Sequence, residues 1–205
     1  MLQFHLVKDS QYKEYLPTEL SFKTAILACL VEGEFELAME LVEEMVSGAS
    51  MEVNSSFELD YGDDIGIVNL KPPWKRIELR EAIIDFSGFD FMSIKNSNDL
   101  ANKMKELNIH VEPNSSWASM IDKVISDKVE PNLIQPTFLV DYPVEMSPLA
   151  KRKSPDSEIV ERFEAFVMGS ELANAFSELN DPIDQRDRFE EQENLRKKFN
   201  DEEMD

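Results

Sequence analysis

Apolar residues recur every three or four positions between residues 35 and 47, with glutamates between them. The apolar positions are Phe35, Ala38, Leu41, Val42 and Met45. The acidic positions are Glu36, Glu40, Glu43 and Glu44. This period predicts an α-helix that buries one face and exposes an acidic one, and Gly48 is a residue type that commonly ends a helix. The largely apolar run 20–31 is too short for periodicity to decide between a helix and a buried strand.

Helical spacing also dominates residues 78–130, where three shorter helices are expected. The first carries Leu79, Ala82, Ile83 and Phe86, with Gly88 beyond it. The second begins at Ser97-Asn98-Asp99 and carries Leu100, Met104 and Leu107. The third follows Ser115-Ser116 and carries Trp117, Met120, Ile121 and Val124. Serine, asparagine and aspartate are good helix caps, and Trp117 is expected to anchor the core.

The remaining apolar segments are short and predict strands. They are residues 65–70, 132–143 and 160–168. A turn is expected at 61–64, and Pro72-Pro73 forces an extended backbone over 71–77. Gly169-Ser170 allows a tight connection into a further strand that begins at Glu171. Mixed helices and strands in this order predict an α+β fold.

Composition narrows the classes of function. The 205 residues carry 21 Lys+Arg against 42 Asp+Glu, a net charge of −21, so the chain as a whole lacks the basic surface that phosphate binding requires. The only compact basic run in the core region, 151–153, is expected to be a solvated loop. One cysteine, Cys29, excludes an internal disulfide and fits a reducing compartment. We predict a cytoplasmic protein without a signal peptide or membrane span, and without a Cys/His zinc site.

Three side chains mark a candidate binding strand. Asn174, Phe176 and Glu178 alternate, so in an extended strand they share one face. A carboxylate, a carboxamide and an aromatic ring suit a ligand with an ammonium group on an aliphatic stem. Alternation alone is more typical of an ordinary amphipathic edge strand.

The whole segment 171–190 decides between these interpretations, because it resembles the amino-acid-binding segment of class II lysyl-tRNA synthetases. Lys71-Pro72-Pro73-Trp74-Lys75-Arg76 resembles a second element of that family, in the correct order, and residues 132–151 resemble a third. The resemblance covers about residues 35–205. It implies part of the antiparallel class II sheet, interrupted by a helical insertion.

The resemblance implies the following division of the chain. Residues 1–34 are unassigned, 35–77 belong to the catalytic domain, 78–130 are the insertion, 131–190 are core strands with the ligand sites, and 191–205 are a charged tail, either a frayed helix or disordered.

The resemblance also implies a chemistry. Lysyl-tRNA synthetases join lysine to ATP as lysyl-adenylate and then transfer the lysyl group to tRNA. By alignment, Glu164 and Glu171 would hold Mg²⁺ against the ATP phosphates. Asn174, Phe176 and Glu178 would form part of the lysine pocket, with Glu178 toward the side-chain ammonium. No covalent protein nucleophile is needed, so no catalytic residue is assigned. Full-length relatives are homodimers.

The chain departs from the family pattern in several ways. No Phe-Arg-x-Glu of the second class II motif precedes residue 35, and the glycine-rich third motif, the first motif and the anticodon-binding barrel are not found. Ser170 stands where many relatives have arginine. We therefore expect a fragment that does not form adenylate alone. Two alternatives stay open: a paralogue that attaches lysine to elongation factor P, and a non-catalytic lysine-binding or interaction relative. The run 179–185 favours the tRNA enzyme.

Overall fold

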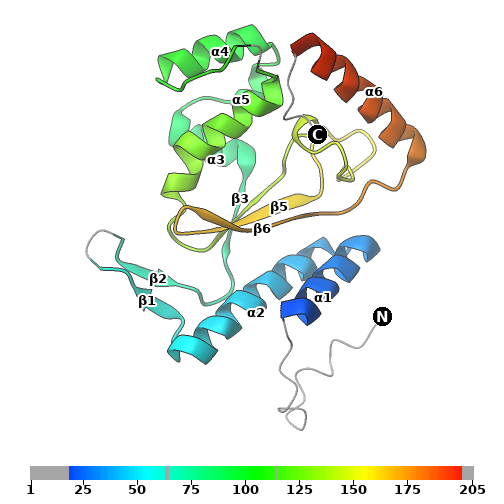
Figure 1. The fold of residues 1–205 in the computed structure, drawn as a ribbon. Helices are drawn as coiled ribbons and strands as arrows, with labels where there is room; N and C mark the ends of the chain where they lie inside the picture. The colour runs from blue at the N-terminus through cyan, green and yellow to red at the C-terminus, as the bar shows by residue number, and fades with distance from the viewer. Residues whose placement is uncertain (1–18, 63–64, 114, 200–205) are drawn as a thin grey trace.

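A four-stranded sheet lies at the centre of the molecule (Figure 1). The computed structural model describes residues 19–62, 65–113 and 115–199. The strands follow in the order β3 (Lys75–Glu78), β4 (Thr137–Val140), β5 (Arg162–Val167) and β6 (Ser170–Phe176). β3 pairs with β4 in parallel, and the other two pairings are antiparallel. The predicted α+β class is confirmed, and the sheet is antiparallel except at its β3 edge.

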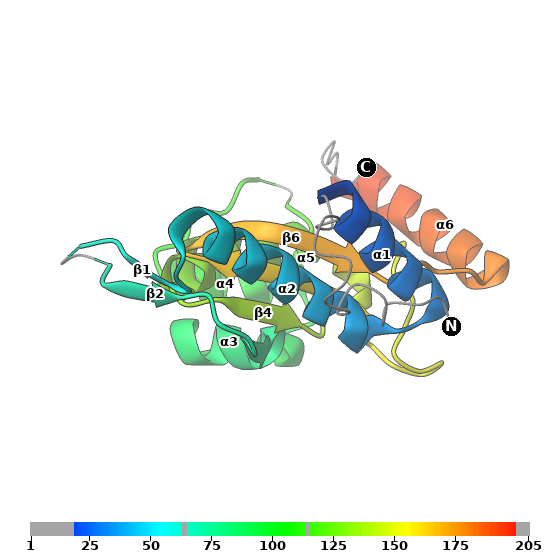
Figure 2. The same ribbon diagram turned by 90° about the horizontal axis from the view of Figure 1, so that it is seen from below.

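Helices α1 (Glu19–Glu32) and α2 (Phe35–Asn54) cover one face of this sheet (Figure 2). Residues 20–31 are thus helical, which settles the alternative that periodicity left open. Aromatic rings join α2 to the strands, with Phe35 and Phe138 both packed on Phe163 at centroid distances of 5.4 and 5.3 Å. Cys29 is buried in this cluster, as expected, and burial raises the pKa of its thiol.

Two expectations about α2 were wrong. The helix does not end at Gly48 but continues to Asn54, and Ser55 takes the left-handed conformation that ends it, with φ of 54°. Gly48 lacks a positive φ, so it works as an ordinary helical residue. Glu43 is not part of a solvated face: it is 4% exposed, and its carboxylate accepts a hydrogen bond of 3.0 Å from the Trp74 backbone N–H. That bond connects α2 to the segment before β3.

The opposite face is covered by α3 (Leu79–Ser87), α4 (Ser97–Glu106) and α5 (Trp117–Val124), which confirms that 78–130 is mainly helical. A π-helical segment, Ile125–Val129, continues α5. Asn96, one residue before the expected cap, caps α4, whereas Ser116 caps α5. Phe86 is 37% exposed, contrary to expectation. Trp117 is half-buried, and its indole N–H donates to the Ile94 carbonyl at 2.7 Å.

The hairpin of β1 (Glu58–Asp60) and β2 (Ile67–Asn69) is a separate two-stranded sheet. The Gln135 side chain accepts from the Asn69 N–H at 3.0 Å and donates to the Ile67 carbonyl at 2.8 Å, so it substitutes for a third strand. The expected turn at 61–64 lies partly outside the described residues. The strands expected at 65–70, 132–143 and 160–168 are observed as the shorter β2, β4 and β5.

Helix α6 (Pro182–Phe199) ends the described chain. It contradicts the expectation that core strands extend to residue 190. It also shows that residues 191–199 are helical, and residues 200–205 of the expected tail lie outside the described part.

The β5–β6 turn is the tightest connection in the sheet. Met168 and Gly169 both have positive φ, 56° and 70°, as a type I′ hairpin turn requires. Their N–H groups donate to the carbonyls of Ile134 and Leu133 at 3.0 Å each. A Cβ atom at Gly169 would lie 3.2 Å from the Glu130 carbonyl oxygen. The turn therefore needs glycine for both conformation and space.

Gly169→Ala is expected to lower the free energy of unfolding by about 2–3 kcal/mol, because left-handed backbone strain and a backbone contact add. Gly88→Ala is the matched control, since Gly88 has a φ of 78° but open space around its Cβ position, and it should lose about 1 kcal/mol. Urea unfolding of both variants measures the difference. Equal losses would show that the Glu130 contact is unimportant.

Candidate functional site

The β5–β6 hairpin brings the predicted site residues together. Arg162 lies opposite Phe176 and Glu164 opposite Asn174, so these four side chains share one face. Nearer the turn, the register moves from Ala165 opposite Ala173 to Phe166 opposite Glu171.

One residue of β6, Leu172, is therefore extra in this pairing. In a regular strand, alternation would place Leu172 beside Asn174 on the site face and Glu171 on the other. Because Leu172 is extra, Asn174 opposes Glu164 and lies on the same face as Glu171, which opposes Phe166. Leu172 is 49% exposed instead. The two glutamates that the resemblance assigned to Mg²⁺ thus lie on one side of the hairpin.

Arg162 organises the polar side chains of this face. Its guanidinium donates to Glu164 Oε1 at 2.5 Å, to Ser147 Oγ at 2.7 Å, to the Met146 carbonyl at 3.0 Å and to Asn174 Oδ1 at 3.3 Å. Asn174 also donates to Glu164 Oε1, at 3.2 Å. Sequence reasoning missed Arg162, although its spacing of two from Glu164 in a strand was a signal that both face the same way.

Tyr142 completes this cluster and was also missed. Its hydroxyl donates to Glu164 Oε2 at 2.6 Å, and the Arg162 guanidinium lies 4.5 Å from its ring centroid, a cation–π contact. Burial raises the pKa of Glu164, while Arg162 and Tyr142 oppose that rise. Burial and the neighbouring Glu164 raise the pKa of Tyr142 well above its ordinary value. Tyr142 is therefore neutral and donates a hydrogen bond to Glu164.

A cavity of about 470 Å³ opens beside this cluster. Arg162, Asn174 and Phe176 line it from the hairpin, and Asp122 of α5 and Glu145 add two carboxylates. The remaining lining residues come from three segments, namely α5 with its cap Ser116, residues 146–150, and α6. Two carboxylates against one guanidinium, together with apolar side chains, suit a cationic ligand with an aliphatic part.

Glu178, the third residue of the predicted lysine strand, is not among the residues that line the cavity. It follows the end of β6, where its backbone forms an isolated bridge with Ala150, a lining residue, and its side chain is exposed. Glu171 is likewise exposed and does not line the cavity. The structure therefore groups Asn174 and Phe176 at the cavity and places Glu178 next to one of its lining segments.

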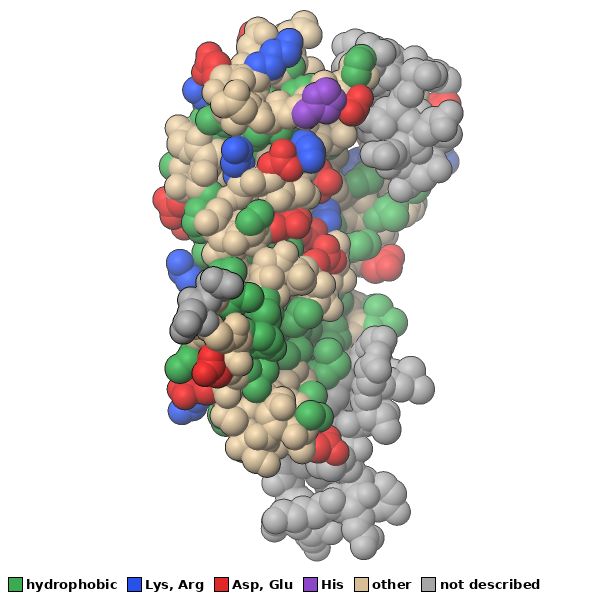
Figure 3. Space-filling model, turned by 60° about the vertical axis from the view of Figure 1, so that its left-hand side comes forward, with side chains coloured by type: hydrophobic (Ala, Val, Ile, Leu, Met, Phe, Trp, Pro, Cys, Tyr) green, Lys and Arg blue, Asp and Glu red, His purple; other side chains and the backbone are tan. Residues whose placement is uncertain are grey.

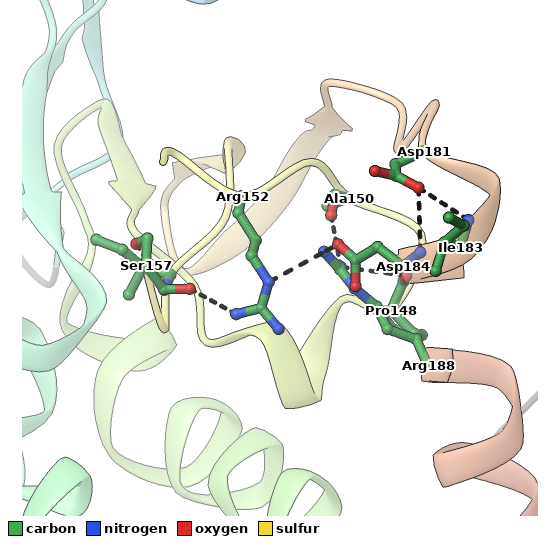
Figure 4. Close-up of polar contacts among 9 residues, drawn as sticks. Pro148, Ala150, Arg152, Ser157, Asp181, Ile183, Asp184 and Arg188 are labelled. Carbon is green, nitrogen blue, oxygen red and sulfur yellow. Dashed lines mark hydrogen bonds and ion pairs between the residues drawn. The ribbon is translucent and has the colours of Figure 1, made fainter. Parts of the chain in front are cut away.

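The 148–152 segment that borders the cavity is tied to α6 (Figure 4). Arg188 donates to the Ala150 carbonyl at 2.7 Å and pairs with Asp184 at 2.6 Å. Arg152 donates to the Ser157 carbonyl at 2.5 Å and lies 3.8 Å from Asp184. Lys153 forms an ion pair with Asp141. The basic run 151–153 is therefore only partly the solvated loop that we expected, because carboxylates neutralise two of its three charges.

The donor set of the hairpin fits Mg²⁺. Glu164 Oε1 accepts two hydrogen bonds, but Oε2 accepts one and keeps a free lone pair. Glu171 raises the pKa of Glu164 by repulsion between like charges, which a divalent cation would relieve. Mg²⁺ typically uses one or two carboxylates together with water and phosphate. Among the described residues, no three His, Cys, Asp or Glu side chains cluster as a denser metal site would require.

The distribution of charge on the surface agrees with the acidic composition of the chain. In Figure 3, lysine and arginine side chains appear singly among acidic and apolar ones, without a continuous basic patch on the face shown. Of the helices within the described residues, none has the length and apolar character needed to cross a membrane.

Comparison with known proteins places this geometry in a family. Residues 31–204 match the family described as tRNA synthetases class II (D, K and N). The chain belongs to this family. Its two glutamates, its hairpin and its Pro-Pro-Trp element therefore lie in a class II synthetase domain, as the resemblance implied.

Similar curated proteins are named lysine–tRNA ligases. The protein of Pelotomaculum thermopropionicum is 47% identical over 162 residues, which are 78% of this chain and 31% of that protein. That of Dehalococcoides mccartyi is 42% identical over 160 residues, 78% of this chain and 32% of the relative. That of Christiangramia forsetii is 40% identical over 181 residues, which are 88% of this chain and 31% of that protein. The chain spans about a third of the length of these relatives.

The raised pKa of Glu164 predicts a specific pH dependence. The folded state holds this proton to higher pH than the unfolded chain, whose ordinary value is 4.5. The stability from this protonation is complete below that value and is lost as pH rises through the folded pKa. Glu164→Gln keeps an acceptor for Arg162 and a donor to Tyr142. Wild type should therefore lose stability relative to this variant between about pH 4 and pH 7.

Urea unfolding at several pH values measures that difference. Asp90→Asn is a control of opposite sign, because the hydrogen bond from Arg80 lowers the pKa of Asp90 and its contribution is lost as pH falls. If the free energies of unfolding of wild type and Glu164→Gln differ by a constant amount over this pH range, the assignment of a raised pKa to Glu164 is wrong.

Proposed function

We propose that this chain forms the part of a lysyl-tRNA synthetase catalytic domain that binds lysine and Mg²⁺–ATP. The observation that carries the proposal is the β5–β6 hairpin, in which the turn pairing puts Glu171 on the face of Glu164 and the extra residue brings Asn174 to that same face. The similarity to proteins named lysine–tRNA ligases supports lysine over other amino acids. The acidic cavity beside Asn174 and Phe176 supports a cationic ligand.

Each side chain then has a distinct role. Glu164 and Glu171 would hold Mg²⁺, which when bound neutralises charge on phosphate oxygens. Arg162 and Tyr142 orient the Glu164 carboxylate so that its free lone pair faces away from their donors. Phe176 packs along the aliphatic stem of lysine, Asn174 fixes its orientation, and the Glu178 carboxylate pairs with its ammonium.

The reaction in the whole protein requires positioning rather than a protein nucleophile. The lysine carboxylate attacks the α-phosphate of ATP and displaces pyrophosphate, and the lysyl group then passes from the adenylate to tRNA with release of AMP. Holding two reactants in line supplies much of such a rate enhancement. The 205-residue chain contains no Phe-Arg-x-Glu or Gly-x-Gly-x-Asp-Arg segment for the phosphates. We therefore infer that it binds lysine and does not form lysyl-adenylate by itself.

Lysine binding tests the pocket. Isothermal titration with lysine should show saturable binding to wild type, about tenfold weaker binding to Asn174→Ala, and a similar loss for Glu178→Gln, since each removes one charge-assisted or oriented hydrogen bond. Glu81→Gln is the control, because Glu81 is an exposed glutamate of α3 away from the cavity. Norleucine, which lacks the side-chain ammonium, should not bind.

The pattern of losses distinguishes the partners of the ammonium. If lysine binding is weakened in Glu145→Gln and not in Glu178→Gln, the partner of the ammonium is Glu145, which lines the cavity. Equal binding of lysine and norleucine would reject a lysine pocket.

Adenylate formation is tested separately by lysine-dependent exchange of pyrophosphate into ATP. The chain is expected to give no exchange above the level of Glu171→Ala. Robust exchange that Glu171→Ala abolishes would contradict the inferred inactivity and would make Glu171 part of a complete ATP site.

A further inference from the structure

Arg188 is a buried arginine of α6, only 6% exposed, that the proposed reaction does not use. Its guanidinium forms a fork with Asp184, with Nε to Oδ1 at 2.8 Å and Nη2 to Oδ2 at 2.6 Å. The third nitrogen, Nη1, donates to the carbonyls of Ala150 and Pro148 at 2.7 and 3.3 Å. Figure 4 shows this side chain extending from α6 to the 148–150 backbone. Nε and Nη2 thus bond to Asp184 within α6, and Nη1 connects the helix to the loop.

That loop also holds the arginine of the site. The Met146 carbonyl and the Ser147 hydroxyl accept from Arg162 Nη1 at 3.0 and 2.7 Å. Residues 146–150 thus have Arg162 at one end and Arg188 at the other. Between them, the Leu149 carbonyl accepts from the Leu179 N–H at 2.8 Å.

Removal of Arg188 would leave the carbonyls of Pro148 and Ala150 without its hydrogen bonds. Ala150 is fully buried, so its carbonyl has no ready access to water, and an unsatisfied buried carbonyl is costly. A shift of the loop that restored its hydrogen bonding would carry the acceptors of Arg162 with it. Lysine at 188 would keep the charge but not the planar fork that serves Asp184 and two carbonyls at once.

We propose that Arg188 is a positioning residue that fixes Arg162, and through it Glu164 and Asn174, by holding residues 146–150 against α6. The contacts belong to the fold and require no ligand. Their consequence for lysine affinity rests on the proposed function. Arg188 itself contacts neither the hairpin carboxylates nor Asn174; it acts through the loop.

The test compares Arg188→Met and Arg188→Lys with Arg80→Met in the 205-residue chain. Arg80 is the matched control because it forms a similar fork with Asp90, at 3.0 and 2.5 Å, on the exposed surface of α3. Two readouts are taken by NMR: the side-chain N–H signals of Arg162, and amide hydrogen exchange at Leu179 and Lys151. The Leu179 N–H donates to the Leu149 carbonyl and the Lys151 N–H, at the end of the loop, donates to the Ser177 carbonyl, both at 2.8 Å.

Arg188→Met should shift the Arg162 signals and speed exchange at Leu179 and Lys151 by about tenfold, the effect of one lost hydrogen bond. Arg188→Lys should show part of both effects. Arg80→Met should show neither, whatever its effect on overall stability. A folded Arg188→Met with unchanged Arg162 signals and unchanged exchange would overturn the proposal.

Two further measurements keep the test decisive. If Arg188→Met does not fold, Asp184→Asn takes its place, since it loosens the fork and keeps the arginine; unchanged Arg162 signals there would also overturn the proposal. Lysine titration of the same variants, expected about tenfold weaker, separates the two hypotheses. Changed Arg162 signals in a chain that never binds lysine would support the positioning role and reject the proposed function.

Discussion

The buried Glu164 carboxylate imposes the strictest requirement on this part of the molecule. A carboxylate removed from water must be hydrogen-bonded or protonated, because the charged form is otherwise too costly. Here Arg162, Asn174 and Tyr142 supply the bonds from three different segments. Satisfying this one group therefore determines how β4, β5, β6 and the 142–147 loop meet.

The arrangement also has an electrostatic consequence. Arg162 and Glu164 form a nearly neutral pair beneath the site, so the exposed Glu171 contributes the uncompensated charge of the hairpin. Asp122 and Glu145, which line the cavity, add two further negative charges. Cations are thus favoured at this surface, in agreement with both a magnesium ion and a lysine side chain. An anionic ligand such as ATP would need its charge compensated by the metal or by residues outside these segments.

Local patterns predicted local features well. The buried face of α2 and the three helices of 78–130 follow from spacing that a single helix must satisfy by itself. Glu43 was misjudged because its partner, the Trp74 N–H, is distant in sequence. Arg162 and Tyr142 were missed for the same reason, since their roles depend on contacts between strands. The site residues Glu164, Glu171, Asn174 and Phe176 came from the family resemblance, and alternation alone would not have placed Glu171 with the others.

Leu172 has a consequence for how this hairpin tolerates change. With a two-residue turn, Ser170 opposes Val167 and Glu171 opposes Phe166, so the turn itself places Glu171 on the face of Glu164. Leu172 acts on the other part of β6, because side chains on a strand alternate between faces and one extra residue reverses the order beyond it. It brings Asn174 opposite Glu164 and Phe176 opposite Arg162. Deletion of Leu172 would therefore leave a regular hairpin with the same pairs.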